Sequence, residues 1–290
     1  MVNSIIKWWR DKNVTTKEDL LNVLNNFQIL FSTNSTSIEG NVVTYQNVRD
    51  IFISGKVNNY TGPVIDLIEI INQKRAFDFL ASKFEQREPI SIEFILKLHK
   101  ILLRDCFTEE AIAKGERPGT FKVHDYCVGT TDVGVEPEYV VEDLEELLEE
   151  INEPNNDVLM TATYFHAIFE SIHPFADGNG RVGRTLMNYF LILNNYPPIV
   201  LNSNEKETYY MALEVYNRTC DLRGFRLFLE EQLIKTWGHK LDKGCSSLQA
   251  YLDANFANEL RQVVPNSFKN LSDTELINMF GEMYVKFKQN

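Results

Sequence analysis

Apolar residues recur along most of the chain at the spacing of a helix that buries one face. Leu20, Leu24, Phe27 and Phe31 follow one another at intervals of three or four residues, so they lie on one side of a helix. The same pattern predicts further helices near residues 44–54, 63–71, 91–103, 144–151, 165–172, 182–193 and 209–216. We therefore expect a mainly α-helical protein.

Two stretches depart from this pattern. Gly, Pro, Thr and Val cluster between Gly115 and Pro137, where Phe121 to Gly134 reads as a strand, a turn and a return strand. One β-hairpin is therefore expected on an otherwise helical protein. After Trp237 the chain becomes polar, and a Ser-x-x-Glu capping pattern at residues 272–275 then predicts a helical tail.

Composition excludes several classes of protein. The 290 residues carry 29 Lys and Arg against 41 Asp and Glu, a net charge of −12, which argues against a nucleic-acid-binding surface. The four cysteines form no C-x-x-C pair, so neither a zinc site nor a disulfide framework is expected. With no apolar run near the roughly 18 residues that span a membrane and no signal-peptide pattern, we expect a cytoplasmic protein that binds no membrane.

The most informative segment lies between the helices predicted at 165–172 and 182–193. Pro174 disfavours helical geometry at His173, so the first helix ends there. Gly178 and Gly180 stand just before the next helix. Glycines allow successive backbone N–H groups to converge, and a helix start adds its unpaired N–H groups. This arrangement predicts an anion-binding site.

The charged residues of the segment support this interpretation. Arg181 and Arg184 lie on one face of the first helical turn, where cations cost roughly 0.3–1 kcal/mol each against the helix dipole. A bound polyanion would supply the compensating charge. Asp177 is then in reach of a Mg²⁺ ion that bridges phosphate oxygens, and His173 is a candidate general base.

Other interpretations of the glycines are weaker. Gly178, Gly180 and Gly183 match the dinucleotide-binding spacing, but that motif follows a strand rather than a helix. The chain has no G-x-x-x-x-G-K-[ST] sequence, which removes the P-loop interpretation. A loop without a ligand would explain isolated glycines or arginines, but it does not explain why all these groups occur within twelve residues.

The full segment resembles the signature of the Fic (Fido) family, His-x-Phe-x-Asp/Glu-Gly-Asn-Gly-Arg-x-x-Arg. It reads His173-Pro-Phe175-Ala-Asp177-Gly178-Asn179-Gly180-Arg181-Val-Gly-Arg184. The resemblance implies a Fic-type helical core over residues 90–237 with one β-hairpin flap. It would follow an N-terminal helical region (1–89) and precede a C-terminal helical extension (238–290).

The resemblance also implies an activity, protein AMPylation, in which AMP passes from ATP to a Ser, Thr or Tyr hydroxyl with Mg²⁺ as cofactor. His173 would be the catalytic base, Asp177 the Mg²⁺ ligand and Phe175 the buried anchor of the loop. The ATP phosphates would contact Gly178, Asn179, Gly180, Arg181 and Arg184, with Arg181 at the β-phosphate and Arg184 at the γ-phosphate. The target protein would dock on the hairpin at residues 120–136 by main-chain pairing.

Two further regions resemble the family's nucleotide pocket. Tyr210 and Asn217, seven residues apart on one helix face, would border the adenine, although Tyr210 could equally pack as an ordinary aromatic residue. Tyr209 and Tyr216 fall on the apolar stripe, where core packing is expected. Gly129 and Thr130 of the hairpin would close over the nucleotide.

An upstream segment, residues 32–41, carries Ser35 and Glu39 one helical turn apart, followed by Gly40. Composition alone suggests a polar linker with a capping serine. The family resemblance instead matches Ser35-x-x-x-Glu39-Gly40 to an inhibitory motif, whose glutamate pairs with the second motif arginine, here Arg184. Glu39 and the γ-phosphate would then compete for one guanidinium group.

Several alternatives to AMP transfer stay open. Phosphate-transferring members of the family depart at the second glycine of the loop, but Gly180 is intact here. Removal of AMP at the same site, with Glu39 aligning water, is a further enzymatic alternative. A non-catalytic protein-binding adaptor and a metal-dependent hydrolase are the remaining ones, the latter weakened by the absence of clustered His ligands. The sequence also leaves self-modification and homo-oligomer formation open.

Overall fold

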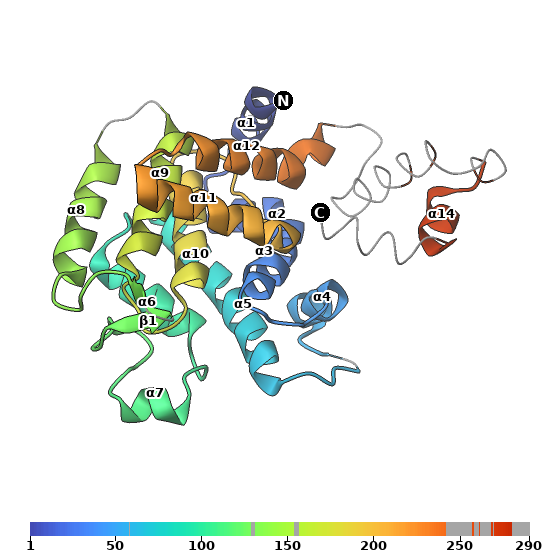
Figure 1. Cartoon of the computed structure of the whole chain (residues 1–290). Helices are drawn as coiled ribbons and strands as arrows, with labels where there is room; N and C mark the ends of the chain where they lie inside the picture. The colour runs from blue at the N-terminus through green and yellow to red at the C-terminus, as the bar shows by residue number, and fades with distance from the viewer. Residues whose placement is uncertain are drawn as a thin grey trace.

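The computed structural model describes residues 1–57, 59–128, 131–153 and 157–241, together with residues 257, 261, 268 and 270–279. The chain is mainly α-helical, as the spacing of its apolar residues predicts (Figure 1). The first helices in order are α1 (Val2–Arg10), α2 (Lys17–Val23), α3 (Asn25–Ile38), α4 (Tyr45–Ser54), α5 (Val64–Glu85), α6 (Ile92–Leu102) and α7 (Glu109–Ala113). After the strands come α8 (Val140–Asn152), α9 (Val158–Ile172), α10 (Asn179–Leu193), η1 (Ser203–Glu205), α11 (Lys206–Thr219), α12 (Arg223–Trp237), η2 (Gly238–Lys240) and α14 (Asp273–Met279).

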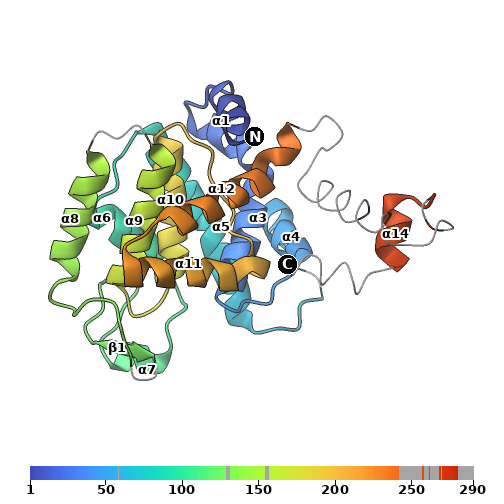
Figure 2. The ribbon, with the colours of Figure 1, turned by 45° about the horizontal axis from the view of Figure 1, so that its top comes forward.

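Two helices, α9 and α10, form the centre of the molecule. They pack along each other, and further helices cover them: α6 and α8 on one side, α3 and α5 on another, and α11 and α12 across a third. Figures 1 and 2 show α8 at the left edge and α11 and α12 crossing in front. Helix α10 is buried on nearly every side, since Arg181 to Ile192 are all buried. Its polar first turn is thus held in the interior by the apolar turns that follow.

The N-terminal helices belong to the same hydrophobic core as the helices after residue 89. Phe27 of α3 stacks on Trp237 of α12 with ring centroids 5.7 Å apart, and Trp9 of α1 lies 5.8 Å from the same ring. A smaller apolar cluster, which includes Val48 and Ile70, joins α3, α4 and α5. Helix α3, which carries Ser35, is therefore fixed by packing on both sides.

The expected hairpin region contains two short paired strands. Strand β1 (Tyr126–Val128) pairs antiparallel with β2 (Thr131–Val133), with Tyr126 opposite Val133. The strands are shorter than the predicted range of 121–134 because the chain on either side bonds elsewhere. Lys122 donates its backbone N–H to the carbonyl of Pro174, and Val135 donates to that of Ile172.

The C-terminal extension is described only in part. Ser272 and Glu275 form the predicted capping box before α14, since the Ser272 hydroxyl accepts the backbone N–H of Glu275 and the Glu275 carboxylate accepts that of Ser272. None of the described helices combines the length and the apolar character that a membrane crossing requires.

Candidate active site

The predicted loop joins α9 to α10 at the centre of the fold. His173 follows the last residue of α9 in the left-handed conformation (φ 52°, ψ 60°), so the chain turns away from the helix there. Gly178 adopts φ 84° immediately before α10, a conformation that glycine takes without strain. Because Gly178 has no side chain to cap the helix, the first N–H groups of α10 are open to an external acceptor.

The Asn179 side chain holds this loop in shape. Its Oδ1 accepts the backbone N–H of Phe175 at 2.9 Å, and its Nδ2 donates to the Phe175 carbonyl at 2.7 Å. Asn179 is 3% exposed. We expected the Asn179 amide to hold a phosphate. In the structure it is already bonded to the loop, and only one Nδ2 hydrogen remains for a phosphate.

The loop rests on a residue that the sequence did not single out, His99 of α6. Its ring lies parallel to that of Phe175, with centroids 3.7 Å apart, and Phe175 is fully buried, as expected for an anchor. Nδ1 of His99 accepts the backbone N–H of Gly119 at 2.8 Å, so Nε2 carries the proton and donates to the carbonyl of Asp177 at 3.1 Å. Burial lowers the pKa of His99 to about 4, which keeps the ring neutral.

The candidate base, His173, is the half-buried first residue of this loop. Burial lowers its pKa below the ordinary 6.5, and the nearby Lys122 ammonium lowers it further. In the neutral imidazole one of the two ring nitrogens carries no proton, and its lone pair can accept one.

Gly134, at the end of the hairpin, lies directly against His173. A Cβ atom at this position would come within 2.5 Å of both the His173 Cβ and the Ile172 carbonyl oxygen. Its φ of 82° also disfavours any other residue. The sequence prediction placed Gly134 in the hairpin but missed this contact. No local pattern links Gly134 to His173, which lies far along the chain.

The second motif arginine, Arg184, is held by the predicted inhibitory segment. Its Nη2 donates to Glu39 Oε1 at 2.6 Å and to the Ser35 carbonyl at 2.8 Å, and its Nε donates to the Ser35 hydroxyl at 3.1 Å. The Arg184 side chain is 1% exposed and that of Glu39 is 31% exposed. Burial alone would lower the pKa of Arg184, but its acidic neighbours, Glu39 first and Glu170 after it, more than reverse this, so the guanidinium stays charged.

The first motif arginine, Arg181, bonds to two carboxylates. Nη2 contacts Asp177 Oδ1 at 3.0 Å, one turn earlier in the chain, and Nη1 contacts Glu69 Oε1 of α5 at 2.5 Å. The Arg181 side chain is 5% exposed. Glu69 lies more than a hundred residues before the motif, and nothing in the sequence pointed to it.

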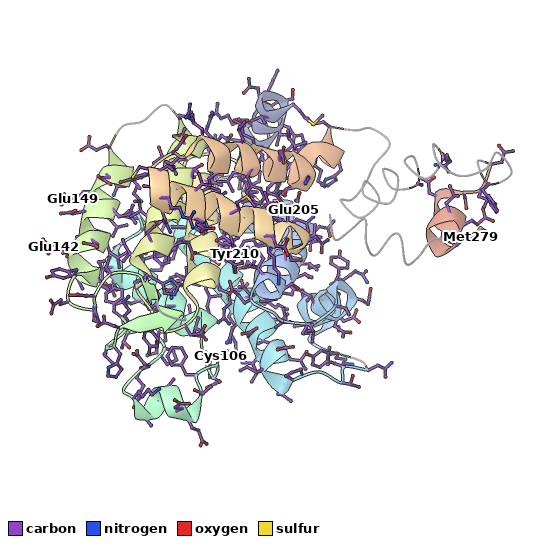
Figure 3. The ribbon with its side chains drawn as sticks, in the orientation of Figure 1. Cys106, Glu142, Glu149, Glu205, Tyr210 and Met279 are labelled. Carbon is purple, nitrogen blue, oxygen red and sulfur yellow. The ribbon has the colours of Figure 1, made fainter. Side chains whose placement is uncertain are left out.

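Helix α11 borders the site as well, apart from the contacts of Glu39 and Glu69 with the two arginines. Tyr210 is 46% exposed and lies where α11 passes over α10 (Figure 3). Burial raises the pKa of its hydroxyl to about 12, and the charge of Glu39 adds to that shift. Asn217 accepts a hydrogen bond from the Ser171 hydroxyl at 2.7 Å, which ties it to the end of α9. Tyr209 and Tyr216 are buried, as the apolar stripe predicted.

The remaining nucleotide contacts that we expected, Gly129 and Thr130, lie outside the described residues. Among the residues that are described, no three His, Cys, Asp or Glu side chains gather as a metal site. Asp177 offers the most exposed carboxylate beside the start of α10, at 55%, against 31% for Glu39 and 15% for Glu69. This fits Mg²⁺, which proteins often hold through one or two carboxylates together with substrate phosphates.

Comparisons with known proteins agree with this geometry. Residues 89–191 match the model of the Fic/DOC family, so this part of the chain is a Fic/DOC domain and the resemblance seen in the motif is confirmed. Protein adenylyltransferase fic-1 of Caenorhabditis elegans is 31% identical over 202 residues, which cover 68% of this chain and 38% of that protein. Protein adenylyltransferase Fic of Drosophila melanogaster is 28% identical over 210 residues, covering 70% and 40% respectively. The chain thus spans about two fifths of the length of these relatives.

Solved structures share the fold. The crystal structure of a Fic domain containing signaling protein from Bacteroides thetaiotaomicron superposes with a TM-score of 0.73 at 23% identity, covering 84% of this chain and 98% of that one. Fic-1 from Caenorhabditis elegans superposes with a TM-score of 0.66 at 25% identity, covering 89% and 72%. The first superposition covers nearly the whole of the other chain. On this chain its 84% coverage extends beyond the Fic/DOC domain and includes helices before residue 89.

Proposed function

We propose that this protein is a protein adenylyltransferase, which transfers AMP from ATP to a Ser, Thr or Tyr hydroxyl of a target protein. One observation carries the proposal: a half-buried His173, whose neutral ring can accept a proton, begins the short loop that leads to the uncapped start of α10 and its two buried arginines. The curated relatives named protein adenylyltransferase support the same activity.

In the proposed reaction the nucleotide phosphates bind at the start of α10. The first N–H groups of the helix bind the α-phosphate, Arg181 the β-phosphate and Arg184 the γ-phosphate. His173 takes the proton from the target hydroxyl as the oxygen forms a bond to the α-phosphorus. The bond between that phosphorus and the bridging oxygen breaks, and pyrophosphate leaves. His173 then releases its proton to solvent.

Asp177 is the residue that would hold Mg²⁺ in this reaction. The ion, when bound, neutralises charge on the phosphate oxygens. The main-chain carbonyl of Asp177 accepts a hydrogen bond from His99 of α6, so the backbone at this ligand is held in place. Its carboxylate meanwhile pairs with Arg181, so the proposed Mg²⁺ ligand and the proposed β-phosphate arginine lie next to each other.

We infer further that Glu39 inhibits the enzyme. Arg184 binds a carboxylate or a phosphate with the same N–H groups, and in this structure Ser35 and Glu39 occupy those of Nε and Nη2. The inhibitory carboxylate also crowds the phosphate site, since a Cβ on Gly180 would lie 2.4 Å from Glu39 Oε1. A triphosphate that cannot reach Arg184 loses in-line alignment of its α-phosphorus.

The target segment is proposed to dock along the hairpin at residues 120–136. The chain next to both strands is hydrogen-bonded to the motif loop, at Pro174 and at Ile172. A segment paired with the hairpin main chain would therefore reach His173 at a fixed distance.

Removal of AMP from a modified protein is a second candidate, favoured by the position of Glu39. Its carboxylate lies beside Gly180, at the start of α10, and part of it is open to solvent. A carboxylate there can orient a water molecule towards a bound phosphate. Loss of one adenylyl mass from a self-modified protein on incubation with wild type would support this activity.

Intact-mass spectrometry tests the main proposal. Glu39→Gly protein incubated with ATP and Mg²⁺, with and without cell extract, is expected to add adenylyl groups to itself or to an extract protein. The matched Glu39→Gly, His173→Ala double variant should still bind ATP but form product about 10³-fold more slowly. Equal incorporation by the two variants would exclude His173 as the base, and no incorporation by either would contradict AMP transfer.

A further inference from the structure

Arg181 is already bound to a carboxylate from outside the motif loop. Glu69 reaches it from the second turn of α5, and its Oε1 lies 2.5 Å from Arg181 Nη1. Both groups are largely withdrawn from water, with 5% of the Arg181 side chain and 15% of the Glu69 side chain exposed. Water therefore screens the attraction between these two charges only weakly.

This pair resembles the one at the other end of the phosphate site. Arg184 contacts Glu39 Oε1 at 2.6 Å, as Arg181 contacts Glu69 at 2.5 Å. In each case an arginine from the first two turns of α10 meets a glutamate from the N-terminal part of the chain. Both cations that a triphosphate would use are therefore paired with protein anions in this structure.

A single segment connects the two pairs. Asn41 follows Gly40 directly after Glu39, and its Nδ2 donates to Glu69 Oε2 at 2.8 Å. The same amide donates to the carbonyl of Asp66 at 3.0 Å, and Asn41 is 7% exposed. The chain that places Glu39 on Arg184 thus also holds the far oxygen of Glu69 while the near oxygen contacts Arg181.

We propose that Glu69 is a positioning residue that weakens β-phosphate binding by competing for Arg181, as Glu39 does for the γ-phosphate at Arg184. The inference rests on the proposed function, since it assumes that Arg181 faces the β-phosphate. The inhibitory segment then acts on both arginines: directly through Glu39, and through Asn41 and Glu69 on Arg181. Removal of Glu39 alone leaves the second contact in place.

Nucleotide binding separates this role from a structural one. ADP has a β-phosphate and AMP does not, so a residue that acts through Arg181 changes the ratio of the two affinities. Glu69→Gln removes the charge and keeps the side-chain size. Isothermal titration calorimetry in Mg²⁺ buffer is expected to show the ADP affinity rising about tenfold relative to the AMP affinity.

The matched control is Asp78→Asn, which makes the same change of charge at an exposed position of the same helix. It should leave the ADP-to-AMP affinity ratio within about twofold of wild type, since at an exposed position water screens the lost charge. Because both nucleotides share one folded population, the ratio holds even if Glu69→Gln lowers stability, and Glu69→Ala gives a second measurement.

The outcomes distinguish the two levels of the argument. An unchanged or lowered ADP-to-AMP ratio in both Glu69 variants, with ADP still binding, would refute the role of Glu69 and leave AMP transfer intact. Failure of wild type and Glu39→Gly protein to bind ADP at all would refute the proposed function, and this inference with it.

Discussion

Glu39→Gly should release the enzyme from inhibition, and its effect can be worked out from the Arg184 contact. Glu39 Oε1 lies 2.6 Å from Arg184 Nη2, and the arginine side chain is 1% exposed. The substitution removes this carboxylate and leaves the two Ser35 contacts to Arg184 in place. Glu39 follows the last residue of α3 with φ −85°, so glycine is accommodated without distorting the helix.

The magnitude follows from the competition for one guanidinium group. Two opposite unit charges roughly 4 Å apart attract by about 4 kcal/mol at an effective dielectric constant near 20. Because 31% of the Glu39 side chain is exposed, water screens part of this attraction, and about 3 kcal/mol is a fair figure. At 1.4 kcal/mol for each factor of ten, the productive binding of ATP, and with it AMP transfer, should rise roughly 100-fold.

Initial rates of labelled AMP incorporation measure this effect. The control is Glu88→Gln, which removes a carboxylate of similar exposure, 33%, from an ion pair with Lys83. It should change the rate less than about twofold. If Glu39→Gly raised the rate by less than threefold while remaining folded, or if Glu88→Gln raised it equally, the competition at Arg184 would not be what limits the enzyme.

Three further predictions concern the loop. In Glu39→Gly protein the rate of AMP transfer should rise with pH up to the lowered pKa of His173 and stay level above about 6.5, because only the neutral ring accepts a proton. An inflection above pH 7 in the pH–rate profile would contradict this. Gly134→Ala should lower kcat about tenfold or more, because the new Cβ would lie 2.5 Å from the His173 Cβ, and wild-type kcat in this variant would show that the contact is unimportant. His99→Phe keeps a ring against Phe175 but loses two hydrogen bonds; thermal unfolding should show a loss of about 2–4 kcal/mol, whereas His99→Gln, which retains a donor and an acceptor, should lose less.

The sequence by itself determined the helical class and the chemistry of the motif loop. Both are local properties: a 3.6-residue period marks the buried face of each helix, and an anion site at a helix start needs only residues that are neighbours in the chain. The segment from His173 to Arg184 could therefore be interpreted without knowledge of the fold. Contact between Glu39 and Arg184 was expected only from the family resemblance, because no local pattern links residues 145 positions apart.

Tertiary structure decided which residues from distant parts of the chain contact this loop. His99 under Phe175, Gly134 against His173 and Glu69 on Arg181 come from three separate parts of the chain. His99 and Glu69 are brought to the loop by α6 and α5, which pack through their apolar faces, and Gly134 is held there by the main-chain hydrogen bond from Val135 to Ile172. Such contacts depend on how the whole core packs. The hydrophobic effect is non-directional, so the apolar pattern of the sequence does not predict which polar residue will lie against the loop. The chemistry of the motif is thus encoded locally, while the groups that support and restrain it are selected by packing.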